Sequence, residues 1–226
     1  MICKGIERLK GSPPTQKLPI TIQILLQIYN QLDKTISLNK TMWAACLVAF
    51  FTFARKSSIL VKSLVFDCNK SLCVRDLAFE DFGLVLTFRH TKTIQVCDRV
   101  LEVPLHYIND SPLCPVRAVK DMMSAFEDAP STTPLFSFKK NGGVVPLTQQ
   151  TFSKCLQTVL KACGLPFDKL SGHSFRRGGA SFAFSVGVPV SIIKLQGDWK
   201  SDSYERYIRV PLNSKVKLAK LLALSV

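Results

Sequence analysis

The segment GHSFRRGGAS, residues 172–181, places one histidine and two adjacent arginines directly before four small residues. Arginine suits a phosphate group, because its planar guanidinium donates two parallel hydrogen bonds and stays charged. A helix that begins here would add backbone N–H groups and the positive end of its dipole. The segment therefore indicates either an anion site that needs close approach or an ordinary, solvated start of a helix.

Three other candidate side chains lie at predicted structural transitions. Arg55 ends a long apolar segment, Lys92 lies in a tight turn, and Tyr207 follows in the segment SYERYIR. Each has an ordinary explanation by itself, since an arginine at a helix end meets the dipole, a turn lysine is solvated and a tyrosine packs. Taken one at a time, these residues predict no function.

The charge of the chain narrows the class of partner. The 226 residues include 30 Lys and Arg against 16 Asp and Glu, a formal charge of +14 at pH 7. An excess of this size favours a polyanion, with nucleic acid first and an anionic membrane second, although an ordinary basic protein is the simpler alternative. Because 47% of the residues are hydrophobic, the chain can bury the core of one large domain or two small ones.

Two classes of protein are disfavoured by the sequence. No signal peptide is visible, and the most apolar stretch, residues 43–54, is far shorter than the roughly 20 residues that span a bilayer. The eight cysteines show no CxxC pair and no histidines at metal-ligand spacing. We therefore expect reduced thiols in an intracellular protein, with neither a disulfide framework nor a metal site.

Apolar periodicity outlines the elements that must position the candidate residues. Helices are predicted over 20–32 and over 41–53, and the second is apolar nearly all round and therefore central. Three stretches rich in Val, Leu and Phe, 71–80, 83–90 and 94–105, predict a small antiparallel sheet. Further helices are expected over 115–127, 148–163 and 172–186, from Pro189 onward, and over 213–224. The expected fold is mainly α with a small three-stranded antiparallel β-sheet.

Taken together, the candidate residues resemble the catalytic domain of tyrosine recombinases, also called the phage integrase family. The resemblance is carried, in chain order, by Arg55, Lys92, His173, Arg176, Trp199 and Tyr207. The most similar segment is GHSFRRGGASFAFSVGVPVSIIKLQGDWKSDSYERYIR, which begins at residue 172, and the resemblance covers residues 15–224. The sequences of these segments look more like those of eukaryotic mobile-element recombinases of the Crypton and DIRS/Ngaro kind than like those of bacterial recombinases.

The resemblance implies a site-specific DNA recombinase, or integrase, that cuts and rejoins strands. Tyr207 would attack phosphorus and hold the DNA end as a 3′-phosphotyrosyl ester, which stores the bond energy for rejoining without a nucleotide cofactor. Arg55 and Arg176 would clamp the scissile phosphate. His173 would act as a base or hydrogen-bond donor, and Lys92 would protonate the leaving 5′-oxygen.

Three features of the sequence depart from the family pattern, and two of them leave a second candidate residue open. Trp199 would donate its indole N–H to a phosphate oxygen, but it lies one residue closer to Tyr207 than usual, and counting back from that tyrosine selects Asp198 instead. Tyr204, three residues before Tyr207, is a second candidate nucleophile. The sequence RYIR favours Tyr207, because it is more similar to the family pattern. Ser58 stands where the family often has a carboxylate that supports the first arginine.

Four further cations are candidate DNA contacts. Arg177 would point about 100° away from its neighbour on a helix and would contact the DNA backbone or be solvated. Lys139 and Lys140 lie in a predicted loop, KKNGG, which either contacts phosphates or is a flexible hairpin loop. Lys200 directly follows Trp199. The amphipathic tail beyond residue 213 either docks onto a neighbouring protomer, as in the family, or packs on its own domain. The first reading implies a tetramer on double-stranded DNA.

The resemblance assigns residues 19–226 to the catalytic domain and 1–18 to a linker or the remnant of an N-terminal DNA-binding domain. It implies a nuclear protein with no membrane partner. Three other readings stay open: a helix–turn–helix DNA-binding protein built around Ala180, Gly187 and Ile193; a domesticated recombinase that binds DNA without cutting it; and a type IB topoisomerase.

Overall fold

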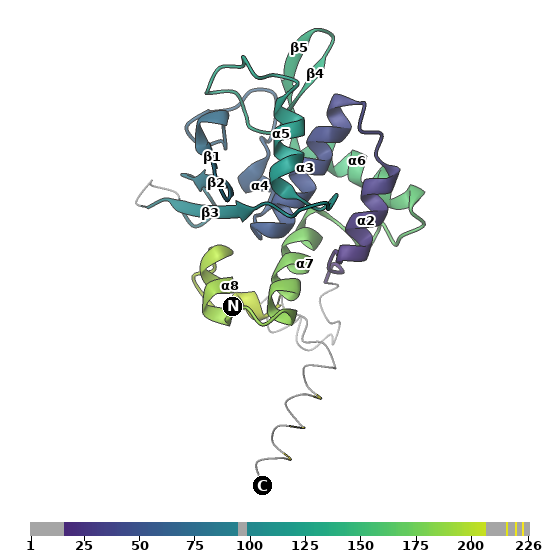
Figure 1. Ribbon diagram of the computed structural model, residues 1–226, viewed down its shortest axis with the longest axis vertical. Coiled ribbons are helices and arrows are strands. Elements are labelled where there is room, and N and C mark those ends of the chain that lie inside the picture. The colour runs from purple at the N-terminus through teal and green to yellow at the C-terminus, as the bar shows by residue number, and fades with distance from the viewer. Residues whose placement is uncertain (1–15, 95–98, 207–215, 217–219, 221–222, 224–226) are drawn as a thin grey trace, which may run out of the picture.

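The computed structural model (Figure 1) describes residues 16–94, 99–206, 216, 220 and 223. The helices are α2 (Ile22–Gln31), α3 (Ser37–Phe51), α4 (Lys56–Ile59), α5 (Pro115–Met123), α6 (Gln149–Ala162), α7 (Gly172–Ser185) and α8 (Val190–Gln196), with the 3-10 turns η1 (Val74–Asp76) and η2 (Asp202–Arg206). The strands are β1 (Leu77–Glu80), β2 (Gly83–Phe88), β3 (Leu101–His106), β4 (Ser137–Lys140) and β5 (Gly143–Pro146).

The three predicted strands form one antiparallel sheet in the order β1-β2-β3, which confirms the expected fold class. β1 is shorter than predicted, because η1 occupies part of the expected range. The Asp76 carboxylate accepts a hydrogen bond from the Cys73 N–H at 2.8 Å and closes that turn. β4 and β5 form a separate two-stranded hairpin, closed by Asn141 and Gly142 at positive φ. Two left-handed residues between paired strands are typical of a type I′ turn.

Helix α3 is the centre of the fold. All ten residues from Thr41 to Phe50 are buried, so the helix has no solvent-exposed face over this length. It packs against α5, α7 and β4, and Figure 1 shows it running through the middle of the molecule. The prediction of a central helix that is apolar all round is confirmed, although α3 begins four residues earlier than expected.

Two glycines on α7 allow its close approach to other backbone segments. A Cβ atom on Gly179 would lie 1.9 Å from the carbonyl oxygen of Phe50 in α3, and one on Gly178 would lie 1.8 Å from that of Ile20. No real Cβ atom tolerates such distances. The small residues of this segment therefore admit the protein's own backbone.

Helices α7 and α8 form a helix–turn–helix unit with a small core of its own. This core contains Phe53, Ala180, Ala183, Ile193 and Trp199. The turn has Gly187 at a φ of +89°, a conformation that L side chains rarely adopt. The residues that the sequence assigned to this unit are therefore confirmed in their structural places.

The segment before α2 is attached to α7. The N–H of Leu18 donates to the carbonyl of Lys169 at 2.8 Å, and that of Ile20 donates to Ser174 at 2.9 Å. The predicted last helix, 213–224, lies mostly outside the described residues. Within the described ranges, no helix combines the length and hydropathy that a bilayer span requires.

Candidate functional site

The candidate site begins where α3 ends. Phe53 adopts a φ of +54°, which is unusual for an aromatic residue, and so turns the chain sharply after α3. The Thr52 hydroxyl supports this turn, because it donates to the Val48 carbonyl at 2.7 Å and accepts from the Ala54 N–H at 3.2 Å. Arg55 then caps α4 in an extended conformation and is half-buried.

The start of α7 supplies the second part of the site. Ser171 accepts a hydrogen bond from the His173 N–H at 3.3 Å, and its own N–H donates to the Ser174 hydroxyl at 3.0 Å. This reciprocal capping fixes the first turn of the helix. It places His173 partly in solvent, while Arg176, one turn later, points inward.

Arg176 joins two turns of the chain. Its guanidinium donates to the Phe53 carbonyl in the turn after α3 and to the Gly197 carbonyl, at 2.7 Å, in the turn after α8. The Trp199 ring covers it, with the guanidinium carbon 3.8 Å from the ring centre. Only 2% of Arg176 is exposed. The tryptophan therefore lies against the arginine, as expected for a ring that packs beneath the site.

Lys92 lies in the connection between β2 and β3. The Thr91 hydroxyl donates to the Asp198 carboxylate at 2.9 Å, and the Thr93 hydroxyl donates to the same carboxylate. Arg99 pairs with it from the other end of the connection. Lys92 itself is exposed, between two threonines that point toward the body of the protein.

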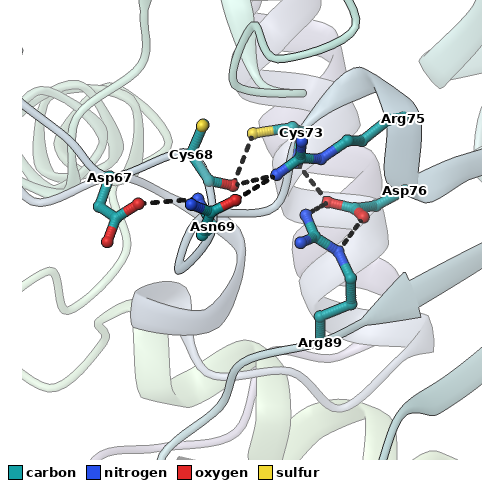
Figure 2. A network of polar contacts seen from close by, with 7 residues as sticks. All are labelled: Asp67, Cys68, Asn69, Cys73, Arg75, Asp76 and Arg89. Atoms are coloured by element: carbon teal, nitrogen blue, oxygen red, sulfur yellow. Dashed lines mark hydrogen bonds and ion pairs between the residues drawn. The ribbon is translucent and has the colours of Figure 1, made fainter. Parts of the chain in front are cut away.

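The end of β2 has a further attachment, shown in Figure 2. Arg89 donates two hydrogen bonds to the Asp76 carboxylate, at 2.6 and 2.9 Å, in a bidentate arrangement. Asp76 is 6% exposed and is also held by the Cys73 N–H, so this ion pair is rigid. The strand that leads to Lys92 is thereby fixed to η1.

His173 has a lowered pKa, and its causes show which cations surround it. Partial desolvation is the largest cause, followed by the positive charges of Arg176, Arg55, Lys56 and Lys92. A nearby cation disfavours the imidazolium, so each of these charges acts in the same direction. Four cations, at the start of α4, in the β2–β3 connection and on α7, therefore lie near enough to act on the charge of one histidine.

The same geometry predicts a pH effect on stability. Because the folded-state pKa of His173 lies below its ordinary value of 6.5, the folded chain binds fewer protons than the unfolded chain just below that pH. Stability is therefore lost as the pH falls through 6.5. We expect the wild type to lose more stability than His173→Gln between pH 7 and about pH 5 in urea unfolding. Equal losses would contradict this.

Arg55 and Arg176 also line one small cavity of ≈ 20 Å³, together with Ser58, Thr91 and Asp198. This volume is about the space of one water molecule. Within the described residues, no carboxylate pairs with Arg55, in keeping with the serine at position 58. Both arginines therefore border one small space, beside the Asp198 carboxylate and several apolar side chains.

Lys56 is a site residue that the sequence reasoning missed. Its ammonium donates to the Ser153 hydroxyl of α6 at 2.8 Å, and its charge acts on His173. Gly172 leaves room for its side chain, since a Cβ atom there would lie 2.9 Å from Lys56 Cδ. Its position directly after Arg55 was the one available signal.

Two predictions about DNA contacts need correction. Arg177 is not solvated: it is 8% exposed and donates to Gln16 at 2.9 Å, because residues before α2 cover this side of α7. Lys139 and Lys140 are not loop residues but belong to strand β4, since Asn141 and Gly142 alone form the turn. Figure 1 shows the β4–β5 hairpin at the opposite end of the molecule from α8, so these lysines do not join the cluster.

The C-terminal candidates are only partly described. Lys200 is exposed beside Trp199. Tyr204 lies in η2, where its ring is 5.7 Å from the Lys194 ammonium and packs on the α7–α8 core. Tyr207 lies outside the described residues, so the preference between the two tyrosines stays a prediction. Asp198 points toward the β2–β3 connection, whereas Trp199 contacts Arg176.

The described residues include six free cysteines and no group arranged to hold a metal ion. Six cysteines in the described ranges are free thiols: Cys46, Cys68, Cys73, Cys114, Cys155 and Cys163. Burial raises the pKa of the Cys73 thiol to about 11, which keeps it protonated. Among the described residues, no group of three or more His, Cys, Asp and Glu side chains is placed to hold a metal ion.

No protein-family model matches the sequence, and no curated protein matches it. The structure is nevertheless similar to solved structures. XerA recombinase has a TM-score of 0.64 at 16% identity, over 92% of this chain and 66% of that one. The XerH site-specific recombinase bound to difH substrate, a pre-cleavage complex, has a TM-score of 0.62 at 15% identity, over 92% and 55%. The Tn1549 transposon integrase in complex with transposon right end DNA has a TM-score of 0.61 at 15% identity, over 94% and 67%.

These similarities establish the fold. A mainly helical domain with a small three-stranded antiparallel sheet is the fold of the tyrosine recombinase catalytic domain, as the sequence resemblance implied. The chain spans 55% of the XerH chain and 66% of the XerA chain.

Proposed function

We propose that this chain is the catalytic domain of a tyrosine recombinase, an enzyme that cuts and rejoins double-stranded DNA. The observation that carries the proposal is that Arg55 and Arg176 line one cavity in a domain with this fold, near enough to His173 that their charges, with those of Lys56 and Lys92, lower its pKa. A cluster of cations suits a phosphodiester, whose negative charge increases during displacement. The carboxylate of Asp198, which borders the same cavity, is paired with Arg99. XerH and the Tn1549 integrase were solved with DNA, which supports DNA as the partner.

The proposed reaction is a displacement at phosphorus. The Tyr207 phenolate oxygen forms a bond to phosphorus while the bond to the 5′-oxygen breaks, which leaves a 3′-phosphotyrosyl ester. Lys92 gives a proton to the departing 5′-oxygen, and the reverse reaction rejoins the strand. No oxidant and no nucleotide are consumed.

The arginines and the histidine are assigned to the non-bridging oxygens. Arg55 is half-buried and can meet a phosphate from the surface. Arg176 is covered by Trp199, so a phosphate oxygen must enter the cavity that both arginines line to reach it. His173, neutral at pH 7 because of its lowered pKa, can donate or accept a single hydrogen bond there.

The remaining assignments are proposals supported by position or by resemblance. Lys139, Lys140 and Lys200 are exposed and would contact the DNA backbone. The resemblance supports a eukaryotic mobile-element origin, a nuclear location, and a domain that extends from residue 19 with 1–18 as linker or remnant.

We also assign self-association on DNA, as a tetramer, to the amphipathic tail beyond residue 213. An apolar cavity of ≈ 210 Å³ lies between the end of α3, α7 and α8, lined by Phe50, Phe182, Val186 and Ile192 among others. Phe182, Val186 and Ile192 are 39–61% exposed. A groove of this kind fits the apolar face of a helix.

The decisive experiment uses a nicked suicide substrate. The nick releases a short strand after cleavage, so the covalent protein–DNA adduct accumulates and survives denaturation. We expect an adduct with the wild type and with Tyr204→Phe, and none with Tyr207→Phe, because phenylalanine has no nucleophile. An adduct with Tyr207→Phe but not with Tyr204→Phe would reverse the assignment.

A catalytically inactive DNA-binding protein is the second candidate. The α7–turn–α8 unit and the inward direction of Arg176 favour it. The same experiment separates the two, since this candidate binds duplex DNA with an affinity that falls steeply as salt increases but forms no adduct on any substrate.

A further inference from the structure

The turn between α8 and Trp199 contains a buried carboxylate that the proposed reaction does not use. Asp198 is 7% exposed and adopts a φ of +52°. Aspartate, asparagine and glycine tolerate this left-handed conformation better than other residues. The residue before it offers its carbonyl to Arg176, and the residue after it covers Arg176, so the turn is already part of the arginine's surroundings.

The carboxylate of Asp198 faces the segment that carries Lys92. It accepts hydrogen bonds from the hydroxyls of Thr91 and Thr93, which are the two neighbours of Lys92 in the chain. Arg99, just before β3, adds an ion pair. One buried side chain therefore holds both ends of the connection between β2 and β3.

Thr91 extends this attachment to the backbone. While its hydroxyl donates to Asp198, the same oxygen accepts from the N–H groups of Thr93 and Ile94, each at 3.1 Å. The Thr91 N–H in turn donates to the Ile94 carbonyl at 2.9 Å. The four residues from Thr91 to Ile94 thus form a closed turn, and Lys92 projects from it into solvent.

The energetics favour a fixed geometry. A buried carboxylate without partners is costly, so Asp198 is stable here only while the threonines and Arg99 stay in place. Hydrogen bonds to an ionised oxygen are also stronger than neutral ones. The charge of Arg99 offsets that of Asp198, which removes the repulsion that a carboxylate next to the phosphate site would otherwise cause.

We propose that Asp198 is a positioning residue for Lys92: it fixes the turn from which the lysine reaches the leaving 5′-oxygen. This inference rests on the proposed function, in which Lys92 is the general acid. Through Gly197 and Trp199 the same turn also contacts Arg176. One short segment of chain therefore fixes the positions of both Lys92 and Arg176.

The first test does not depend on activity. Asp198→Gly and Asp198→Asn both suit a left-handed residue, so they remove the carboxylate or its charge without backbone strain. We expect hydrogen exchange at the amides of Thr91, Thr93 and Ile94 to become faster in Asp198→Gly. The matched control is Asp110→Gly, an exposed aspartate at a φ of +50°, which should leave these amides unchanged. Unchanged exchange in Asp198→Gly would overturn the inference.

The second test asks whether the turn acts through Lys92. In a substrate whose bridging 5′-oxygen is replaced by sulfur, the leaving thiolate needs no proton, because thiols are far stronger acids than alcohols. On the oxygen substrate we expect Lys92→Ala to slow adduct formation by about 10²- to 10⁴-fold. Asp198→Gly should slow it by about 10- to 100-fold, as a displaced catalytic group does. On the sulfur substrate both should react at nearly the wild-type rate.

The outcomes distinguish a failure of the proposed function from a failure of the positioning role of Asp198. If the wild type forms no adduct with either substrate, the proposed function is wrong, and hydrogen exchange alone decides whether Asp198 holds the turn. If Lys92→Ala is rescued by sulfur but Asp198→Gly is slow on both substrates, Asp198 acts through the arginine or through general stability, and the inference is wrong. Partial recovery in Asp198→Asn, which keeps an acceptor oxygen, would support the positioning role.

Discussion

Replacing Arg176 by alanine lowers the free energy of unfolding by about 3 to 5 kcal/mol. The substitution removes the donors to the buried carbonyls of Phe53 and Gly197 and the cation beneath the Trp199 ring. Each buried acceptor left without its donor costs about 1 to 3 kcal/mol, and the loss of the ring contact adds to this. Urea unfolding followed by circular dichroism measures the difference.

Arg177→Ala is the matched control for this variant. Arg177 is adjacent on the same helix, carries the same charge and is also buried, but it donates to the exposed side chain of Gln16, an acceptor that water can satisfy once the arginine is removed. We expect it to cost about 1 to 2 kcal/mol, clearly less than Arg176→Ala. Equal costs for the two variants would show that Arg176 does not join the two turns. Arg176 would then be available to a phosphate without disturbing the fold.

Replacing Gly179 by alanine should also destabilise the protein strongly. The added Cβ would meet the Phe50 carbonyl at 1.9 Å and the Phe53 ring at 2.7 Å, and the first of these is backbone in the central helix. Alanine gains about 1 kcal/mol of helix propensity over glycine, which offsets only part of the overpacking. We expect a net loss of about 2 to 3 kcal/mol, or roughly 4 to 12 °C in Tm, measured by calorimetry.

Gly172→Ala tests whether the loss of stability depends on which atoms the added Cβ would meet. It lies in the first turn of the same helix, but its added Cβ would meet the flexible side chain of Lys56, which can move aside. We expect a change within about 0.5 kcal/mol. A similar loss at both glycines would mean that α7 is intolerant of alanine in general, and that its close contact with α3 is not the cause.

Local patterns predicted much of the fold. The all-round apolar character of 41–53 correctly indicated a central helix, and three stretches rich in Val, Leu and Phe indicated the sheet. The errors in this region came from assigning KKNGG to a loop, from extending the first strand into η1, and from starting the third strand at residue 94 although β3 begins at Leu101. Asn-Gly between two apolar runs is itself a strong hairpin signal, so the place of Lys139 and Lys140 was within reach of the sequence.

The side-chain partners of the site could not be predicted in the same way. Arg177 is buried because Gln16, 161 residues earlier, lies against it. Lys56 enters the site through Ser153, 97 residues later, and Asp198 meets Thr91 across 107 residues. Such contacts depend on how the helices and loops pack in three dimensions, and the periodicity of apolar residues in the sequence does not predict them. The sequence indicated Arg55, Lys92 and Arg176 but not Lys56, and it could not say which of these cations face inward.

The attachment of residues 16–20 to α7 has a consequence for synthesis on the ribosome. Ile20 and Leu25 are fully buried in the finished protein, yet α6 and α7, against which this segment packs, emerge well over a hundred residues later. Until then helix α2 can form only some of its native contacts, such as that of Tyr29 with Trp43 of α3. Contacts between such distant parts of a chain form slowly and leave apolar surface exposed in the meantime. These contacts therefore form only after α7 has been made, and part of the apolar face of α2 stays exposed until then.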